Sequence, residues 1–139
     1  MTQGKNKFQP LTSKSVCLIY ELLFERGFVS FPLTHFSTDK VDSLVATIVN
    51  SYFGFELYPS VEEKAVAYLY FLIKDHAFTD GNKRTACLAF EVVCDLNSLD
   101  PIYDGFTLDE LAVLIEKSNL EHHQLIKLVT SLLFPTIKL

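Results

Sequence analysis

The strongest constraint on the fold comes from two stretches that are apolar on nearly every side of a helix. The first covers residues 65–73, after a capping sequence that begins at Ser60, and the second covers residues 86–93. A helix that lacks a polar stripe must be covered by neighbouring elements over most of its surface. We therefore expect two buried helices at the centre of the molecule, with other helices packed around them.

Capping residues and helical periodicity predict the surrounding helices. One follows a cap at Thr12 or Ser13, and another begins at Ser37 or Thr38. Thr107 opens a capping box, in which the residue three positions later is a glutamate. The predicted surrounding helices cover residues 13–26, 38–49, 107–118 and 121–134.

The segment 50–58 differs from the rest because it is rich in aromatic residues and has neither a cap nor helical periodicity. We expect a short β-hairpin there. The fold class is therefore predicted as an all-α bundle of about six helices with one small hairpin. A chain of 139 residues fits a single domain over residues 1–139, with residues 1–10 as a loose N-terminal arm.

Composition restricts the compartment and the class of partner. The net charge is −5, whereas nucleic-acid binding depends on clustered Lys and Arg, so we expect no nucleic-acid partner. No apolar run approaches the roughly 20 residues of a membrane span, and the N-terminus has no apolar segment typical of a signal peptide. The three cysteines show no C-x-x-C spacing and fit buried helix faces. We expect a cytoplasmic protein that does not enter membranes.

Charged residues gather in the connection 76–84, HAFTDGNKR, between the two apolar helices. Gly81 permits a sharp turn, and the following helix presents unpaired N–H groups and the positive end of its dipole. Lys83 and Arg84 add positive charge that is favourable there only if an anion binds. Asp80 supplies an oxygen ligand suited to Mg²⁺ beside phosphate groups.

Two further residues of this connection complete a chemical site. His76 can accept a proton from an attacking hydroxyl at neutral pH. Phe78, buried in the core, would anchor the loop and position His76. The residues alone favour phosphate chemistry with a histidine base and a metal, against the alternative of a solvated helix end.

The string resembles the signature of the Fic/Doc family, H-x-F-x-[D/E]-G-N-[G/K]-R. All six fixed positions are present: His76, Phe78, Asp80, Gly81, Asn82 and Arg84. The resemblance extends over residues 50–97 and, through residues 56–65, is similar to the RhuM-like group of the family. It implies a fold in which this loop joins two central helices.

The resemblance also implies a role for each site residue. His76 would be the general base, and Asp80 would hold the metal. The phosphates of the nucleotide would bind to Gly81, Asn82, Lys83 and Arg84. A flap at residues 52–58 would hold the target as an added strand, through Phe53, Phe55, Leu57 and Tyr58. The alternative for Phe53 and Phe55 is a place in the core.

Departures from the signature indicate which reaction is favoured. Adenylyl-transferring members have Gly where this chain has Lys83, and a second Arg where it has Cys87. The sequence instead resembles the death-on-curing (Doc) branch, in which the terminal phosphate of ATP or another nucleoside triphosphate is transferred to a protein hydroxyl. AMP transfer is the alternative, and a non-catalytic binding module is the second alternative.

The same resemblance implies partners. The target would be a protein that carries a Ser or Thr hydroxyl, with a translation GTPase as one candidate. No Glu in the chain has Ser or Thr four residues earlier and Gly or Asn after it, as the family's self-inhibitory helix requires. We therefore expect an external inhibitor, the antitoxin of a toxin–antitoxin pair.

His122 and His123 are the other dense histidine site. A metal site needs further Cys or carboxylate ligands at workable spacing, and Glu121 alone is weak support. We expect these histidines on a solvated helix face.

Overall fold

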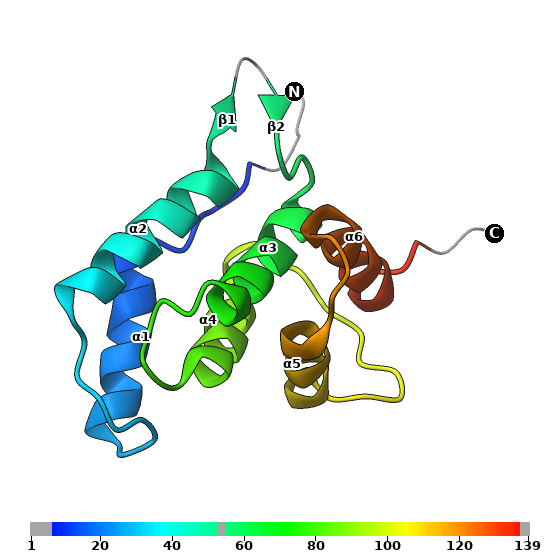
Figure 1. The fold of residues 1–139 in the computed structure, drawn as a ribbon. Coiled ribbons are helices and arrows are strands. Elements are labelled where there is room, and N and C mark those ends of the chain that lie inside the picture. Colours follow the sequence, from blue (N-terminus) through cyan, green and yellow to red (C-terminus); the bar gives the residue numbers. More distant parts are fainter. Residues whose placement is uncertain (1–6, 53–54, 137–139) are drawn as a thin grey trace.

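Helices α3 (Val61–Lys74) and α4 (Asn82–Leu96) pack against each other at the centre of the fold (Figure 1). The computed structural model describes residues 7–52 and 55–136. Residues 64–69 of α3 are all buried, as expected for a helix without a polar stripe. Helix α4 is less enclosed than predicted, because Leu88 and Val92 are 38% and 37% exposed. Within the described ranges, none of the helices combines the length and the hydrophobicity that a membrane span requires.

The other helices cover two sides of this central pair. Helix α1 (Ser13–Glu25) packs on α2 (His35–Val49) and on α4, and α2 also packs on α3. On the other side, α5 (Leu108–Lys117) contacts both central helices, and α6 (His122–Leu133) contacts α3 (Figure 1). The predicted all-α class is confirmed.

The strands are minimal. β1 (Ser51–Tyr52) and β2 (Phe55–Glu56) pair in antiparallel fashion, with Ser51 opposite Glu56 and Tyr52 opposite Phe55. Residues 53–54, which connect them, lie outside the described residues. The described residues therefore contain a two-residue ladder and do not show a larger flap.

Part of the predicted N-terminal arm is held against the helices. Residues 1–6 lie outside the described residues, but the Phe8 ring lies 6.2 Å from that of Tyr68. The Gln9 N–H donates to Asn97 Oδ1 at 2.7 Å, and Asn97 Nδ2 donates back to the Gln9 carbonyl at 2.9 Å. The Tyr68 hydroxyl donates to the Leu11 carbonyl at 2.7 Å. The part of the arm next to α1 is thus attached rather than loose, because the core provides partners for its backbone.

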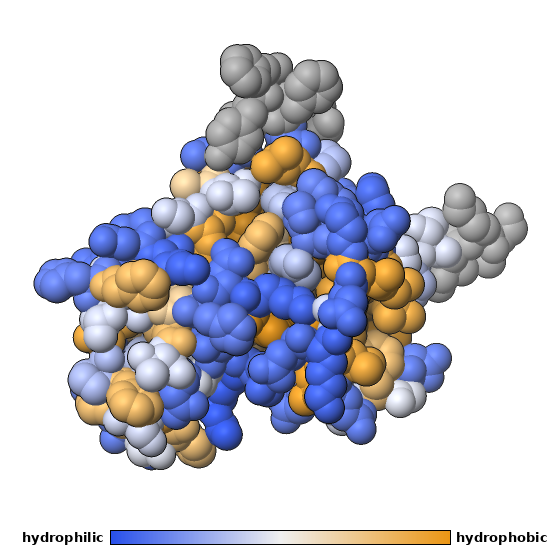
Figure 2. All heavy atoms as spheres, viewed as in Figure 1, coloured by the Kyte–Doolittle hydropathy of each residue, from blue (hydrophilic) through white to orange (hydrophobic). Residues whose placement is uncertain are grey.

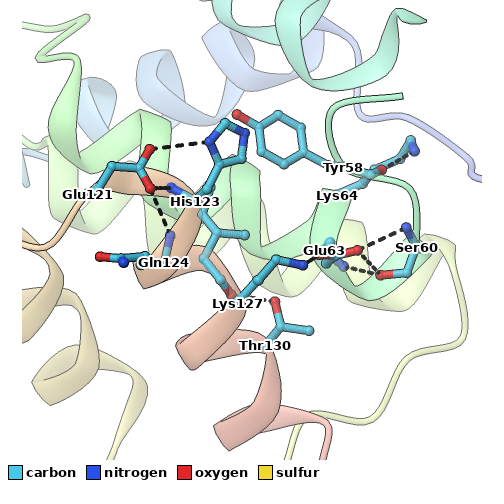
Figure 3. Close-up of polar contacts among 10 residues, drawn as sticks. Tyr58, Ser60, Glu63, Lys64, Glu121, His123, Gln124, Lys127 and Thr130 are labelled. Atoms are coloured by element: carbon cyan, nitrogen blue, oxygen red, sulfur yellow. Dashed lines mark hydrogen bonds and ion pairs between the residues drawn. The ribbon is translucent and has the colours of Figure 1, made fainter. Parts of the chain in front are cut away.

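A buried lysine joins the hairpin to α3. Lys64 is buried, and its Nζ lies 2.6 Å from Glu56 Oε1 and donates to the Tyr58 carbonyl (Figure 3). A buried ammonium is tolerated only when hydrogen-bonding partners compensate its lost hydration. The lysine therefore fixes how the chain passes from β2 into α3.

Replacing Lys64 tests this contact. We expect Lys64→Met to lower the free energy of unfolding by about 1–3 kcal/mol, because the buried Tyr58 carbonyl loses its donor. The matched control is Lys127→Met, since Lys127 is 73% exposed and its Nζ lies 3.5 Å from Glu63 Oε2. An exposed pair contributes about 0–1 kcal/mol, so the control should change stability little in urea denaturation. Equal losses in the two variants would contradict a structural role for Lys64.

Candidate active site

The connection between α3 and α4 lies in a hydrophilic part of the surface, between the α1–α2 pair and α5 (Figures 1 and 2). Helix α3 ends at its C-cap Asp75, and the next residue, His76, has a left-handed backbone with φ of 48°. Glycine is the usual residue after a helix C-cap, since other residues are strained there. His76 is exposed. The chain therefore places an accessible imidazole where backbone preference alone would favour glycine.

The side chain of Asn82 closes the loop that follows. Its Oδ1 accepts the Phe78 N–H at 3.0 Å, and its Nδ2 donates to the Phe78 carbonyl at 2.8 Å. Asn82 was predicted to bind phosphate, but its side-chain amide is engaged within the loop. Its backbone N–H and the second N–H of Nδ2 remain as the groups that it can contribute to an anion site.

Phe78 anchors this closed loop to α1. It is 3% exposed, and its ring stacks on Tyr20 with a centroid separation of 4.2 Å and an interplanar angle of 5°. The Tyr20 hydroxyl donates to the Phe31 carbonyl at 2.6 Å. Burial, and then the Asp80 carboxylate, raise the pKa of Tyr20, so this hydroxyl remains protonated. The predicted burial of Phe78 is confirmed, while its partner Tyr20 was not identified from the sequence.

The connection between α1 and α2 packs against the loop that joins α3 and α4. Gly81 has φ of 78°, and a Cβ atom there would lie 2.2 Å from Val29 Cγ1. The Ser30 N–H donates to Asp80 Oδ2 at 3.4 Å, a long bond. A side chain larger than that of glycine at position 81 would overlap Val29, and the bond to Asp80 depends on the backbone of Ser30. Residues so far apart in sequence leave no local pattern from which the contacts could be predicted.

The N-terminus of α4 has the features of an anion site. Among the six described helices it alone lacks a side-chain cap, and its first turn contains no acidic residue. The other five are capped by side chains, those of Thr12, Thr34, Ser60, Thr107 and Glu121. Uncapped N–H groups at a helix N-terminus favour an anion such as phosphate, and Lys83 and Arg84 strengthen this preference.

Both cations of this turn contact other parts of the protein. Lys83 Nζ lies 3.1 Å from Glu116 Oε1, and the two side chains are 43% and 37% exposed. Lys74 Nζ holds the end of α5, because it donates to the carbonyls of Glu116 and Ser118 at 3.0 Å and 2.8 Å. The Arg84 guanidinium lies 5.1 Å from the centre of the Phe28 ring. An incoming phosphate would therefore compete with a carboxylate for Lys83.

A cavity of about 460 Å³ adjoins Arg84, with Phe28, Cys87, Glu91 and Asp109 in its lining. The pKa of Cys87 is raised to about 12, first by burial and then by the charges of Asp109 and Glu91. The thiol is therefore neutral. This side of Arg84 carries carboxylates and no positive charge at position 87.

Asp80, the predicted metal ligand, is accessible in the structure. Its carboxylate is exposed, and its described partner is the long bond from Ser30. Mg²⁺ prefers one or two carboxylates together with phosphate oxygens and water. Asp80, beside an anion site, offers such a carboxylate.

Among the predicted flap residues, the exposure of Leu57 and Tyr58 is described. Phe53 lies outside the described residues, Phe55 belongs to β2, and Leu57 is 38% exposed. The structure corrects the prediction that Tyr58 contacts the target, because this residue is only 2% exposed. Its ring lies 6.0 Å from Phe71 and 5.7 Å from His123, and burial raises its pKa to about 12.

Comparisons with known proteins identify the family of the chain. Residues 10–94 match the family model described as the Fic/DOC family. A segment of 59 residues is 37% identical to a protein named Toxin Doc from Mycolicibacterium smegmatis. The match covers 42% of this chain and 45% of that relative, so it spans less than half of either protein. No solved structure matches the chain at a significant level.

Two glycine substitutions test the support of the loop. Gly105 has φ of 86° with no atom within 4 Å of an added Cβ, so Gly105→Ala should lower stability by about 1–2 kcal/mol through backbone strain alone. Gly81→Ala should lower it by about 1–3 kcal/mol more, because of the overlap with Val29. Both free energies of unfolding can be measured in urea. Equal losses would show that Val29 does not restrict position 81.

Proposed function

The chain belongs to the Fic/DOC family. We propose that it is a Doc-like transferase that uses a nucleoside triphosphate as its phosphate donor. It moves the terminal phosphate of ATP, or of another nucleoside triphosphate, to a Ser or Thr hydroxyl of a target protein. The observation that carries this proposal is that one short connection contains His76, exposed in a left-handed conformation, and leads directly into the uncapped and cationic N-terminus of α4.

In the proposed reaction, His76 accepts the proton of the target hydroxyl. The hydroxyl oxygen forms a bond to the terminal phosphorus while the bond from this phosphorus to the bridging oxygen breaks, and the nucleoside diphosphate leaves. The backbone N–H groups at the start of α4, with Lys83 and Arg84, stabilise the negative charge of the phosphates. Mg²⁺ held by Asp80 would neutralise part of that charge when bound.

Cys87 supports terminal-phosphate transfer over AMP transfer. Adenylyl-transferring relatives position the outer phosphates with an Arg at this point of the signature. Here a neutral thiol lies near Asp109 and Glu91, whose negative charges would repel those phosphates. The second candidate, AMP transfer, is favoured by Gly81 and Asn82, which the signature shares with adenylyl transferases.

The partners follow from the same family. The relative is named a toxin, so we extend to this chain the role of toxin in a toxin–antitoxin pair. An antitoxin protein would inhibit it, and a protein, with a translation GTPase as one candidate, would be the target. Leu57, exposed next to β2, is the described residue best placed to contact the target segment.

The test combines labelled ATP with two glycine variants. We expect wild-type protein with Mg²⁺ and cell lysate to transfer label from the γ-phosphate and none from the α-phosphate. His76→Gly should abolish transfer but raise the free energy of unfolding by up to about 1 kcal/mol, because glycine relieves the left-handed strain. Ser98→Gly is the matched control, since Ser98 also has a positive φ, 54°, after a helix C-cap. It should gain similar stability and keep full transfer.

The other outcomes of the labelling assay identify the remaining candidates. Label from the α-phosphate on protein would replace the proposal with AMP transfer. Absence of label from both positions, with His76→Gly equal to wild type in cells, would leave only a binding module.

Freeing Lys83 should strengthen nucleotide binding. Glu116→Gln removes the competing carboxylate, and we expect the KM for nucleotide to fall about two- to fivefold with kcat unchanged, as the strength of an exposed ion pair implies. The control Glu62→Gln removes the same charge from α3 near Asn97, at the opposite end of α4. An equal fall in KM in both variants would attribute the effect to net charge alone.

A further inference from the structure

The N-terminal end of α6 gathers one carboxylate and two imidazoles. Atoms of Glu121, His122 and His123 that can bind a metal all lie within 4.8 Å of one another. Within the described ranges this is the only group of three such donors. The sequence suggested a solvated helix face, but the structure turns these side chains toward one another. We propose that they form a Zn²⁺ site, which the proposed transferase reaction does not use.

The distances fit a zinc ion. Nδ1 of His122 lies 3.1 Å from Glu121 Oε2, and Nδ1 of His123 lies 3.2 Å from the same oxygen. Ligand atoms bound at about 2.0–2.1 Å to a tetrahedral zinc ion lie about 3.3 Å apart. The two glutamate–histidine distances are therefore close to those around a bound ion, and the donor atoms of the two imidazoles lie within 4.8 Å of each other. Two histidines and one glutamate also form a donor set that suits zinc and leaves a fourth position open to water.

The two carboxylate oxygens of Glu121 make different contacts. Oε1 accepts the N–H groups of His123 and Gln124, at 3.1 Å and 3.2 Å, and so caps the helix. Oε2 faces the imidazole of His123 (Figure 3) and also lies 3.1 Å from Nδ1 of His122. A cation near a helix N-terminus is normally unfavourable. Here the capping oxygen already pairs with the N–H groups, and the other oxygen remains for the metal.

Aromatic residues of the core hold both imidazole rings in place. His123 stacks against Tyr58 at 5.7 Å, with an angle of 25° between the rings (Figure 3). His122 lies 6.1 Å from Tyr70 and 6.0 Å from Phe71. Rings restrained in this way lose less conformational freedom when they bind an ion. Their side chains are still 37% and 46% exposed, so an ion can reach them from solvent.

The described cysteines do not offer an alternative zinc site. Cys17, Cys87 and Cys94 are buried, and burial raises their pKa values to about 11, 12 and 12. Zinc binds the thiolate form, which these residues do not reach near neutral pH.

Zinc binding to the untagged full chain tests the proposal. We expect one equivalent of Zn²⁺ per chain in competition with a chelating indicator dye, and a rise in Tm when Zn²⁺ is added. His122→Ala, His123→Ala and Glu121→Gln should each weaken binding at least tenfold and remove the rise in Tm. Glu121→Gln keeps an oxygen that can cap the helix, so its loss of zinc would not reflect loss of the cap. His35→Ala, which removes an exposed histidine elsewhere, should bind zinc as wild type does.

Co²⁺ gives a second readout, because a tetrahedral cobalt site has intense visible absorption bands. These bands should appear with wild-type protein and be absent with either histidine variant. Wild-type zinc affinity in His122→Ala or in His123→Ala would overturn the three-ligand site. Failure of wild-type protein to bind Zn²⁺ at millimolar concentration would overturn it as well. Neither result would bear on transfer from ATP.

Discussion

The packing of α3 against α4 is the constraint on which the rest of the structure depends. These helices follow each other in the chain, and α3 is buried over its whole middle section. Because charged groups cannot enter their interface without a large desolvation penalty, the charged residues between them emerge together at one end of the pair. The imidazole of His76 and the carboxylate of Asp80 therefore lie in the short connection that leads to the N-terminus of α4.

Much of the helical framework could be predicted, because caps and apolar periodicity are local properties of the chain. The capping box at Ser60 forms as expected and opens α3. Helix α2 starts earlier than predicted, because Thr34 rather than Ser37 is the cap, and the Ser37 N–H donates to the Thr34 hydroxyl. The start of α4 at Asn82 agrees with the expectation that Lys83 and Arg84 lie in the first turn of the helix after Gly81.

The site could be predicted only in part. A linear motif places candidate side chains in one loop, and so it predicts His76 and Asp80 as site residues. A linear motif does not identify partners from distant segments, such as Tyr20, which stacks on Phe78, or Glu116, which pairs with Lys83. Tyr58 was misplaced because an aromatic residue beside a hairpin has the same local pattern whether it faces solvent or the core. Its burial depends on Phe71 and His123, which come from two other helices.

The contact of Val29 with Gly81 has a consequence for how much chain the site requires. A fragment limited to residues 50–97 would contain every residue of the signature. It would lack Tyr20, Val29 and Ser30, and with them the surface against which the loop is shaped. A fragment that is long enough to identify the family is therefore too short to hold the loop in place.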